Sequence, residues 1–101
     1  MKTIIVDDEI WAIEQLRNSF YNKSDVELVG CFRDPIEALR YAEGSRVDFA
    51  LLDVKMNGMD GIELGRRLRQ KYPSVIIVYV SSYPEYFSDA YRDVRADYYM
   101  L

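Results

Sequence analysis

The sequence predicts one α/β domain over residues 1–101, built on a parallel five-stranded sheet with helices on both faces. Two observations lead to this prediction. Short β-branched or apolar runs alternate along the whole chain with segments whose apolar residues recur at the helical period. The segments between them are short, and such alternation is typical of right-handed crossovers between parallel strands.

The first strand and helix are predicted near the start of the chain. Residues 3–6, Thr-Ile-Ile-Val, form a β-branched run typical of a strand that is buried on both faces. Residues 10–21 show the helical period, and Asp7 and Asp8 are suitable N-cap types for this helix. Its inward face is predicted to hold Ile10, Ile13, Leu16 and Phe20.

A second strand and helix follow. Residues 26–32 predict the strand. Asp34 and Pro35 suit the N-cap and the first position of the helix, which we expect to end near Gly44. The inward face of this helix is predicted to hold Ile36 and Leu39.

The third strand is predicted within residues 47–54, where Phe-Ala-Leu-Leu ends in Asp53. The stretch Asn-Gly-Met-Asp-Gly at residues 57–61 is a turn signal. Residues 62–72 predict a helix that ends before Pro73. Its inward face is predicted to hold Ile62, Leu64 and Leu68, and its outward face Arg66, Arg67, Arg69 and Lys71.

The last part of the chain completes the alternation. Residues 75–80 give the strongest strand signal, and a loop over 81–84, a weaker helix over 85–94 and a strand over 98–101 follow. The expected topology is flavodoxin-like, with strand order 2-1-3-4-5. In such sheets ligands bind beyond the carboxyl ends of the strands, where the strand order reverses.

Composition excludes several classes of function. The net charge of −4 and the sequence pI of about 4.8 argue against nucleic-acid binding and anionic membrane binding by this domain. No histidine is present, and the single cysteine cannot form an intrachain disulfide. We find no signal peptide and no apolar run near the roughly 20 residues of a membrane span. A cytoplasmic location is expected.

Polar residues gather at the predicted carboxyl ends of three strands. Asp7 and Asp8 follow the first strand, Asp53 the third and Ser81 the fourth. Taken singly, an aspartate in such a position more often caps a helix or stabilises a turn. Taken together, they predict a shallow acidic pocket whose repulsion a hard cation such as Mg²⁺ would relieve. A carboxylate beside Mg²⁺ is a plausible nucleophile toward phosphorus.

Three motifs, in order and spacing, carry a family resemblance: VDDE at 6–9, LLDVKMNGMDGIEL at 51–64 and VSSY at 80–83. Over its whole length the chain resembles the receiver domain of a two-component response regulator. The stretch SSYPEYFSDAY at 81–91 is most similar to receivers with LytTR-type DNA-binding output domains.

The resemblance implies a role for each site residue. It makes Asp53 the phosphoacceptor, Asp8 a direct Mg²⁺ ligand and Asp7 a ligand through water. Lys55 would lend its backbone carbonyl to the metal, and Ser81 would hydrogen-bond a phosphoryl oxygen, with the small Ser82 leaving access open.

The end of the chain departs from the family pattern. The family carries a lysine at the end of the fifth strand, and no lysine follows Lys71 here. Either that lysine would be residue 102 and Tyr99 is the switch aromatic, which we prefer, or Leu101 replaces it and Tyr98 is the switch aromatic. Asn57 also stands where the family usually has proline.

The resemblance also implies a fifth helix, which this chain lacks, so we interpret it as a C-terminally incomplete receiver domain. The strand-five surface that this helix would cover favours a homodimer or an exchange of elements there.

The leading hypothesis is a signalling switch in which a sensor histidine kinase phosphorylates Asp53 with Mg²⁺ and an effector domain outside this chain responds, which makes the domain a phosphoacceptor and not an enzyme in its own right. One alternative is a phosphorylation-independent interaction module. Another is a magnesium phosphatase acting through an aspartyl phosphate, which is disfavoured because Lys55 stands where such enzymes need an acid.

Overall fold

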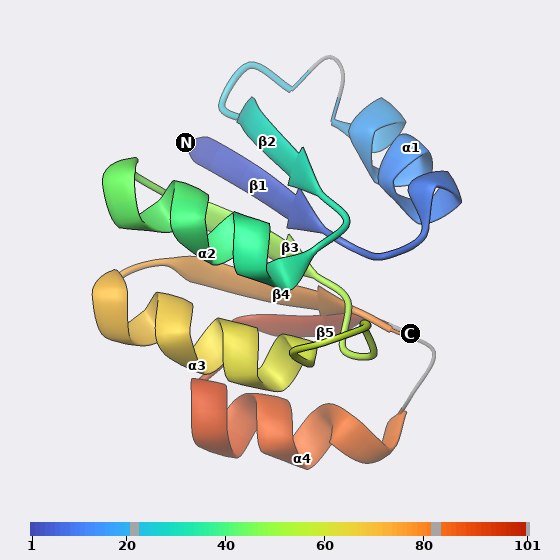
Figure 1. The fold of residues 1–101 in the computed structure, drawn as a ribbon, viewed down its shortest axis with the longest axis vertical. Helices are drawn as coiled ribbons and strands as arrows, with labels where there is room; N and C mark the ends of the chain where they lie inside the picture. The colour runs from blue at the N-terminus through green and yellow to red at the C-terminus, as the bar shows by residue number, and fades with distance from the viewer. Residues whose placement is uncertain (21–22, 82–83, 101) are drawn as a thin grey trace.

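The computed structural model describes residues 1–20, 23–81 and 84–100 and shows one parallel sheet in the order β2-β1-β3-β4-β5 (Figure 1). This confirms the predicted topology. The strands are β1 (Lys2–Val6), β2 (Glu27–Phe32), β3 (Phe49–Leu52), β4 (Ile76–Val80) and β5 (Tyr98–Met100). Each neighbouring pair is parallel.

Helices cover both faces of the sheet. The helical elements are α1 (Ile10–Ser19), α2 (Pro35–Gly44), α3 (Gly61–Lys71), a 3₁₀ turn η1 (Pro84–Tyr86), α4 (Phe87–Asp89) and a π-helical turn η2 (Ala90–Val94). The elements α2, α3 and α4 lie on one face and α1 on the other (Figure 1). No helix within residues 1–20, 23–81 and 84–100 is long and apolar enough to cross a membrane.

Alternating strand residues divide the core into two parts. The larger part packs under α2, α3 and η2 and includes Ile4, Val6, Leu52, Ile77 and Tyr79. The smaller part packs under α1 and consists of Ile5, Ile13 and Leu51 with partly buried neighbours. Burial on both faces explains why these strands are almost continuously apolar.

The caps of α2 and α3 follow from short polar side chains. The Asp34 carboxylate accepts a hydrogen bond from the Ile36 amide at 2.9 Å, and Pro35 opens the helix as predicted. Asp60 accepts one from the Glu63 amide at 2.9 Å.

The predicted capping of α1 by Asp7 or Asp8 was wrong. The N-cap residue is Glu9, and its side chain makes no capping bond. Asp7 instead accepts a hydrogen bond from the Glu9 amide at 2.9 Å, because the chain turns before the helix begins. Both aspartates therefore stay at the edge of the sheet.

Three predictions about helix faces were also wrong. Ile10 is exposed in the first turn of α1, and Ile36 is exposed because it lies off the buried face of α2, which Pro35, Ala38 and Ala42 form. Arg69 was expected to point outward, but its side chain is only 11% exposed.

Arg69 has its own set of partners at the amino edge of the sheet. Its guanidinium donates to the backbone carbonyls of Pro73, Val75, Val94 and Arg95. It also pairs with the Asp97 carboxylate. Val94 is the last residue of η2, and Pro73, Val75 and Arg95 lie in the segments that follow α3 and η2, where the guanidinium fork supplies donors to their carbonyls.

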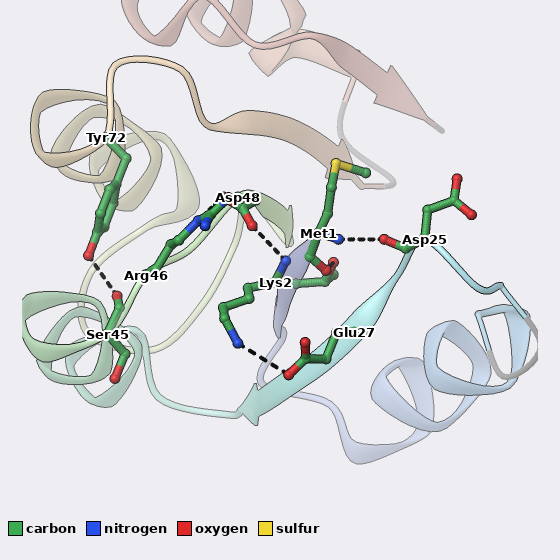
Figure 2. Close-up of polar contacts among 9 residues, drawn as sticks. Met1, Lys2, Asp25, Glu27, Ser45, Arg46, Asp48 and Tyr72 are labelled. Atoms are coloured by element: carbon green, nitrogen blue, oxygen red, sulfur yellow. Dashed lines mark hydrogen bonds and ion pairs between the residues drawn. The ribbon is translucent and has the colours of Figure 1, made fainter.

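The same edge carries further polar contacts between the β1, β2 and β3 segments. Figure 2 shows the Lys2 ammonium against Glu27, at 3.3 Å, and the Lys2 amide donating to Asp48, at 2.8 Å. The Tyr72 hydroxyl, just after α3, donates to the Ser45 carbonyl, at 2.6 Å (Figure 2). These contacts fix the edge opposite to the predicted acidic pocket.

Candidate functional site

The three predicted acids meet at the carboxyl edge of the sheet. Val6 and Leu52 are register partners at the ends of β1 and β3, so the residues that follow them leave the sheet side by side. The Asp53 amide donates to the Val6 carbonyl at 2.9 Å, which holds the two chains together beyond the last pair. One carboxylate oxygen from each of Asp7, Asp8 and Asp53 lies within 4.8 Å of the other two.

These acids line a hollow of about 540 Å³. Its walls include every residue predicted for the phosphoryl and metal site, namely Asp7, Asp8, Asp53, Lys55 and Ser81, together with Glu9, Ala12, Met56, Asn57 and Val80. Glu9, Ala12, Met56 and Asn57 were not predicted as site residues. Their only sequence signal is their nearness in the chain to the acids.

The charges in the hollow repel each other. The pKa of Asp53 is raised from 3.8 to about 7, mainly by burial and then by the neighbouring charges of Asp7 and Asp8. Burial also raises the pKa of Asp7, with the charge of Asp8 adding to the effect. The donors are all oxygens on one open side, which fits a hard cation such as Mg²⁺ that keeps several waters.

The loop after Asp53 is shaped by two glycines. Gly58 has a φ of +91°, which favours glycine and agrees with the predicted turn at 57–61. Gly61 donates its amide to the Val54 carbonyl at 2.6 Å. A Cβ at Gly61 would collide with the Asp53 carbonyl oxygen and carbon, so the start of α3 rests on the Asp53 backbone itself.

Lys55 lies at the mouth of the hollow. Its ammonium is 5.6 Å from the centroid of the Tyr86 ring in η1, a cation–π distance. The sequence prediction concerned only the Lys55 carbonyl, and the side-chain contact was missed because η1 is far away in the sequence.

The two candidate switch tyrosines differ in burial. Tyr99 is 7% exposed and faces the core, whereas Tyr98 is 58% exposed. Burial raises the pKa of Tyr99, and a hydrogen bond with the Ser81 side chain opposes that rise. Which of the two tyrosines is the switch aromatic stays a prediction. Leu101 and Ser82 lie outside the described residues. Whether Leu101 replaces the family lysine, and what Ser82 does, therefore stay predictions.

Sequence reasoning missed one buried residue near the site. Tyr79 in β4 is fully buried, and its hydroxyl donates to the Gly61 carbonyl at 2.6 Å. Its ring lies 5.9 Å from the Tyr99 ring, centroid to centroid. The available signal was a tyrosine inside an otherwise aliphatic strand, since a buried hydroxyl requires a partner.

Comparison with known proteins identifies the family of the chain. The family profile described as response regulator receiver domain matches residues 3–101. The transcriptional regulatory protein YpdB of Escherichia coli K12 is 32% identical over 98 residues, which cover 97% of this chain and 40% of YpdB. The chain thus spans well under half the length of this curated relative.

Solved structures give the same result. The crystal structure of the response regulatory domain of MrkE from Klebsiella pneumoniae matches with a TM-score of 0.92 and 31% identity, covering 100% of this chain and 82% of that one. The response regulator TrrA from Thermotoga maritima, in complex with Mg(2+)-BeF, matches with a TM-score of 0.85 and 25% identity, covering 99% and 84%. The chain therefore belongs to the response regulator receiver domain family.

Proposed function

We propose that this domain is a phosphorylation-dependent signalling switch in which Asp53 accepts a phosphoryl group from a sensor histidine kinase in a Mg²⁺-dependent reaction. The observation that carries the proposal is the approach of Asp7, Asp8 and Asp53 to within 4.8 Å at the point where the strand order reverses. An acidic cluster alone is common, but here it lines a hollow with Ser81 and Lys55 in a receiver-family chain.

Each site residue has a separate role in this proposal. Asp8 would hold Mg²⁺ directly, Asp7 would hold it through water, and the Asp53 carboxylate and the Lys55 carbonyl would complete the protein ligands. When bound, the ion supplies positive charge for the phosphoryl oxygens. The Asp53 carboxylate oxygen then forms the bond to phosphorus while the bond between phosphorus and the donor nitrogen breaks.

Output would pass from the phosphoryl group through Ser81 to Tyr99. Ser81 lines the hollow, and its hydroxyl would donate to a phosphoryl oxygen. Its side chain also forms a hydrogen bond with the buried Tyr99, which supports this route. Binding would then shift the population between two arrangements of the α4–β5 region. We further propose a cytoplasmic regulator with a separate effector domain of the LytTR type that acts on transcription. The name of YpdB, a transcriptional regulatory protein, supports the action on transcription, and the length of YpdB that this chain leaves unmatched is room for an effector domain.

The first test is phosphate uptake. We expect the chain, incubated with Mg²⁺ and acetyl phosphate, to gain the mass of one phosphoryl group, and Asp53→Asn to gain none, because the amide is not a nucleophile. Intact-mass spectrometry measures both. Absence of uptake by the unmodified chain, or equal uptake by Asp53→Asn, would contradict the proposal. Continuous release of phosphate at many turnovers would instead indicate the phosphatase.

We also propose self-association through β5. Tyr98 and Met100 are exposed on this edge strand, and exposed apolar edges tend to pair. Light scattering at rising concentration should show a dimer for the unmodified chain and a monomer for the double variant Tyr98→Ser with Met100→Ser. A monomer in both cases would refute this part of the proposal.

A further inference from the structure

Tyr79 lies on β4, between β3, which leads into Asp53, and β5, which carries Tyr99. In the sheet register it stands opposite Leu52 on β3 and opposite Tyr99 on β5. Leu52 directly precedes Asp53, and Tyr79 lies two residues before Ser81. The Tyr79 side chain is fully buried and is the largest such side chain among the described residues.

The hydroxyl of Tyr79 reaches the start of α3. It donates to the Gly61 carbonyl at 2.6 Å in a buried hydrogen bond. Gly61 in turn donates its amide to Val54 at 2.6 Å and lies directly on the Asp53 backbone, with no space for a Cβ. A single residue thus separates the Tyr79 hydroxyl from the main chain of the phosphoacceptor.

A second glycine is needed for this contact. A Cβ on Gly65 would collide with the Tyr79 hydroxyl oxygen and would lie 2.9 Å from Val94 Cγ1 and 3.2 Å from Tyr79 Cζ. Glycine in the middle of a helix is unfavourable relative to alanine. The hydroxyl therefore accounts for a glycine that the helix itself would not favour.

The ring of Tyr79 makes the contact to Tyr99. The two ring centroids are 5.9 Å apart, with the ring planes at 40°, and Tyr99 is almost fully buried. Because interiors are close-packed, the Tyr99 ring cannot move without changing the surroundings of the Tyr79 ring. Tyr99 is therefore connected to the β3–α3 loop by a route that does not pass through Ser81.

We propose that Tyr79 is a positioning residue that couples the β3–α3 loop to Tyr99. Phosphorylation of Asp53 would then change the surroundings of Tyr99 through the Tyr79–Gly61 hydrogen bond as well as through Ser81. This inference rests on the proposed phosphorylation of Asp53. It deepens that function by assigning a second internal connection between the site and the α4–β5 surface.

The test uses a matched pair of hydroxyl deletions. Tyr79→Phe removes the hydroxyl bonded to Gly61, at the site end of α3. Tyr72→Phe removes a hydroxyl that donates to the Ala42 and Ser45 carbonyls at the other end of α3 (Figure 2 shows the Ser45 bond). Each variant removes one tyrosine hydroxyl that donates to backbone carbonyl groups, so a general loss of stability would appear in both.

The readout is the response of Tyr99 to Mg²⁺ with beryllofluoride, followed by aromatic NMR resonances assigned from Tyr99→Phe. In the unmodified chain and in Tyr72→Phe we expect the Tyr99 resonance to shift equally on loading. In Tyr79→Phe we expect a smaller shift at saturation and about two- to tenfold weaker beryllofluoride binding, the range that one hydrogen bond supplies. A purely structural role of Tyr79 would leave the shift at saturation unchanged.

Two outcomes would overturn the inference without touching the proposed function. One is phosphate uptake at Asp53 with the same Tyr99 response in Tyr79→Phe as in Tyr72→Phe. The other is uptake with no Tyr99 response in the unmodified chain. Absence of uptake by the unmodified chain would instead remove the proposed function, and this inference with it.

A double-mutant cycle tests the contact independently of phosphorylation. Gly65→Ala should lower the melting temperature of the unmodified chain, because the new Cβ meets the Tyr79 hydroxyl. Combined with Tyr79→Phe, which removes that oxygen, the same change should lower it much less. Equal decreases in the two backgrounds would overturn the placement of the hydroxyl against Gly65.

Discussion

Gly61→Ala is expected to destabilise the fold by about 3 kcal/mol or more and to abolish phosphate uptake, since overpacking against a rigid neighbour costs at the upper end of such changes. The added Cβ meets the carbonyl group of Asp53 and Val54 Cα, all backbone atoms that no rotamer change can move aside. Either α3 must start farther from the sheet or Asp53 must leave its place between Asp7 and Asp8. Urea unfolding and intact-mass phosphorylation measure the two effects.

Gly44→Ala is the matched control. Gly44 is the last residue of α2, and a Cβ there would have no atom within 4 Å. Alanine favours the helix by up to about 1 kcal/mol over glycine, so this variant should be neutral or slightly more stable. If both variants unfold at the same urea concentration, α3 does not rest on the Asp53 backbone as described.

The second large effect concerns the charge of the acidic pocket without metal. The pKa of Asp53 is raised in the folded state to about 7 from an ordinary value of 3.8, mainly by burial and then by the charge of Asp7. Between about pH 4 and pH 7 the folded chain therefore keeps a proton that the unfolded chain has released. The contribution of Asp53 to stability is present below this window and is lost as the pH rises through it.

Asp53→Asn should therefore stabilise the metal-free protein at pH 7.5 and have little effect at pH 4. If the whole difference in pKa were converted into free energy of unfolding, it would amount to about 4 kcal/mol. We expect about 1–2 kcal/mol because the side chain is partly exposed and solvent screens its neighbours. Thermal unfolding in EDTA across this pH range measures the effect, and Mg²⁺ should stabilise the unmodified chain more than the variant.

Asp48→Asn provides a control of opposite sign. The Asp48 carboxylate accepts hydrogen bonds from the Lys2 amide and from Arg46, which lower its pKa below the usual value. Its contribution is present above the ordinary pKa and is lost as the pH falls below it, so the variant should be less stable at pH 7.5. If Asp48→Asn and Asp53→Asn change the stability at pH 7.5 in the same direction, the repulsion assigned to the pocket is wrong.

The sequence predicted much of this architecture because each signal was local. The alternation of strands and helices followed from the alternating apolar periods, and the predicted cap at Asp34 is a short-range hydrogen bond. The acids could be brought together because parallel strands end at the same edge. Asp7, Asp8, Asp53, Lys55 and Ser81 accordingly lie around one hollow.

What the sequence could not predict depends on contacts between distant segments. Arg69 reads as an outward residue in the pattern of α3, and its partners at 94–97 appear only once η2 and β5 are in place. Tyr79 reads as one more strand residue, because its role depends on the glycines at 61 and 65 across the layer. The difference in burial between Tyr98 and Tyr99 also depends on the register of β5.

The contacts of Arg69 also affect how the molecule responds to changes in pH and in cation concentration. Its guanidinium joins the segments around Pro73, Val94 and Asp97 at the amino edge, and a guanidinium keeps its charge at any pH at which proteins work. The opposite rim holds carboxylates that gain or lose charge with protons and cations. The positive charge of Arg69 is thus permanent whereas the charge of the pocket is reversible, so the pocket can change its charge while the backbone contacts of Arg69 at the far end of the sheet remain.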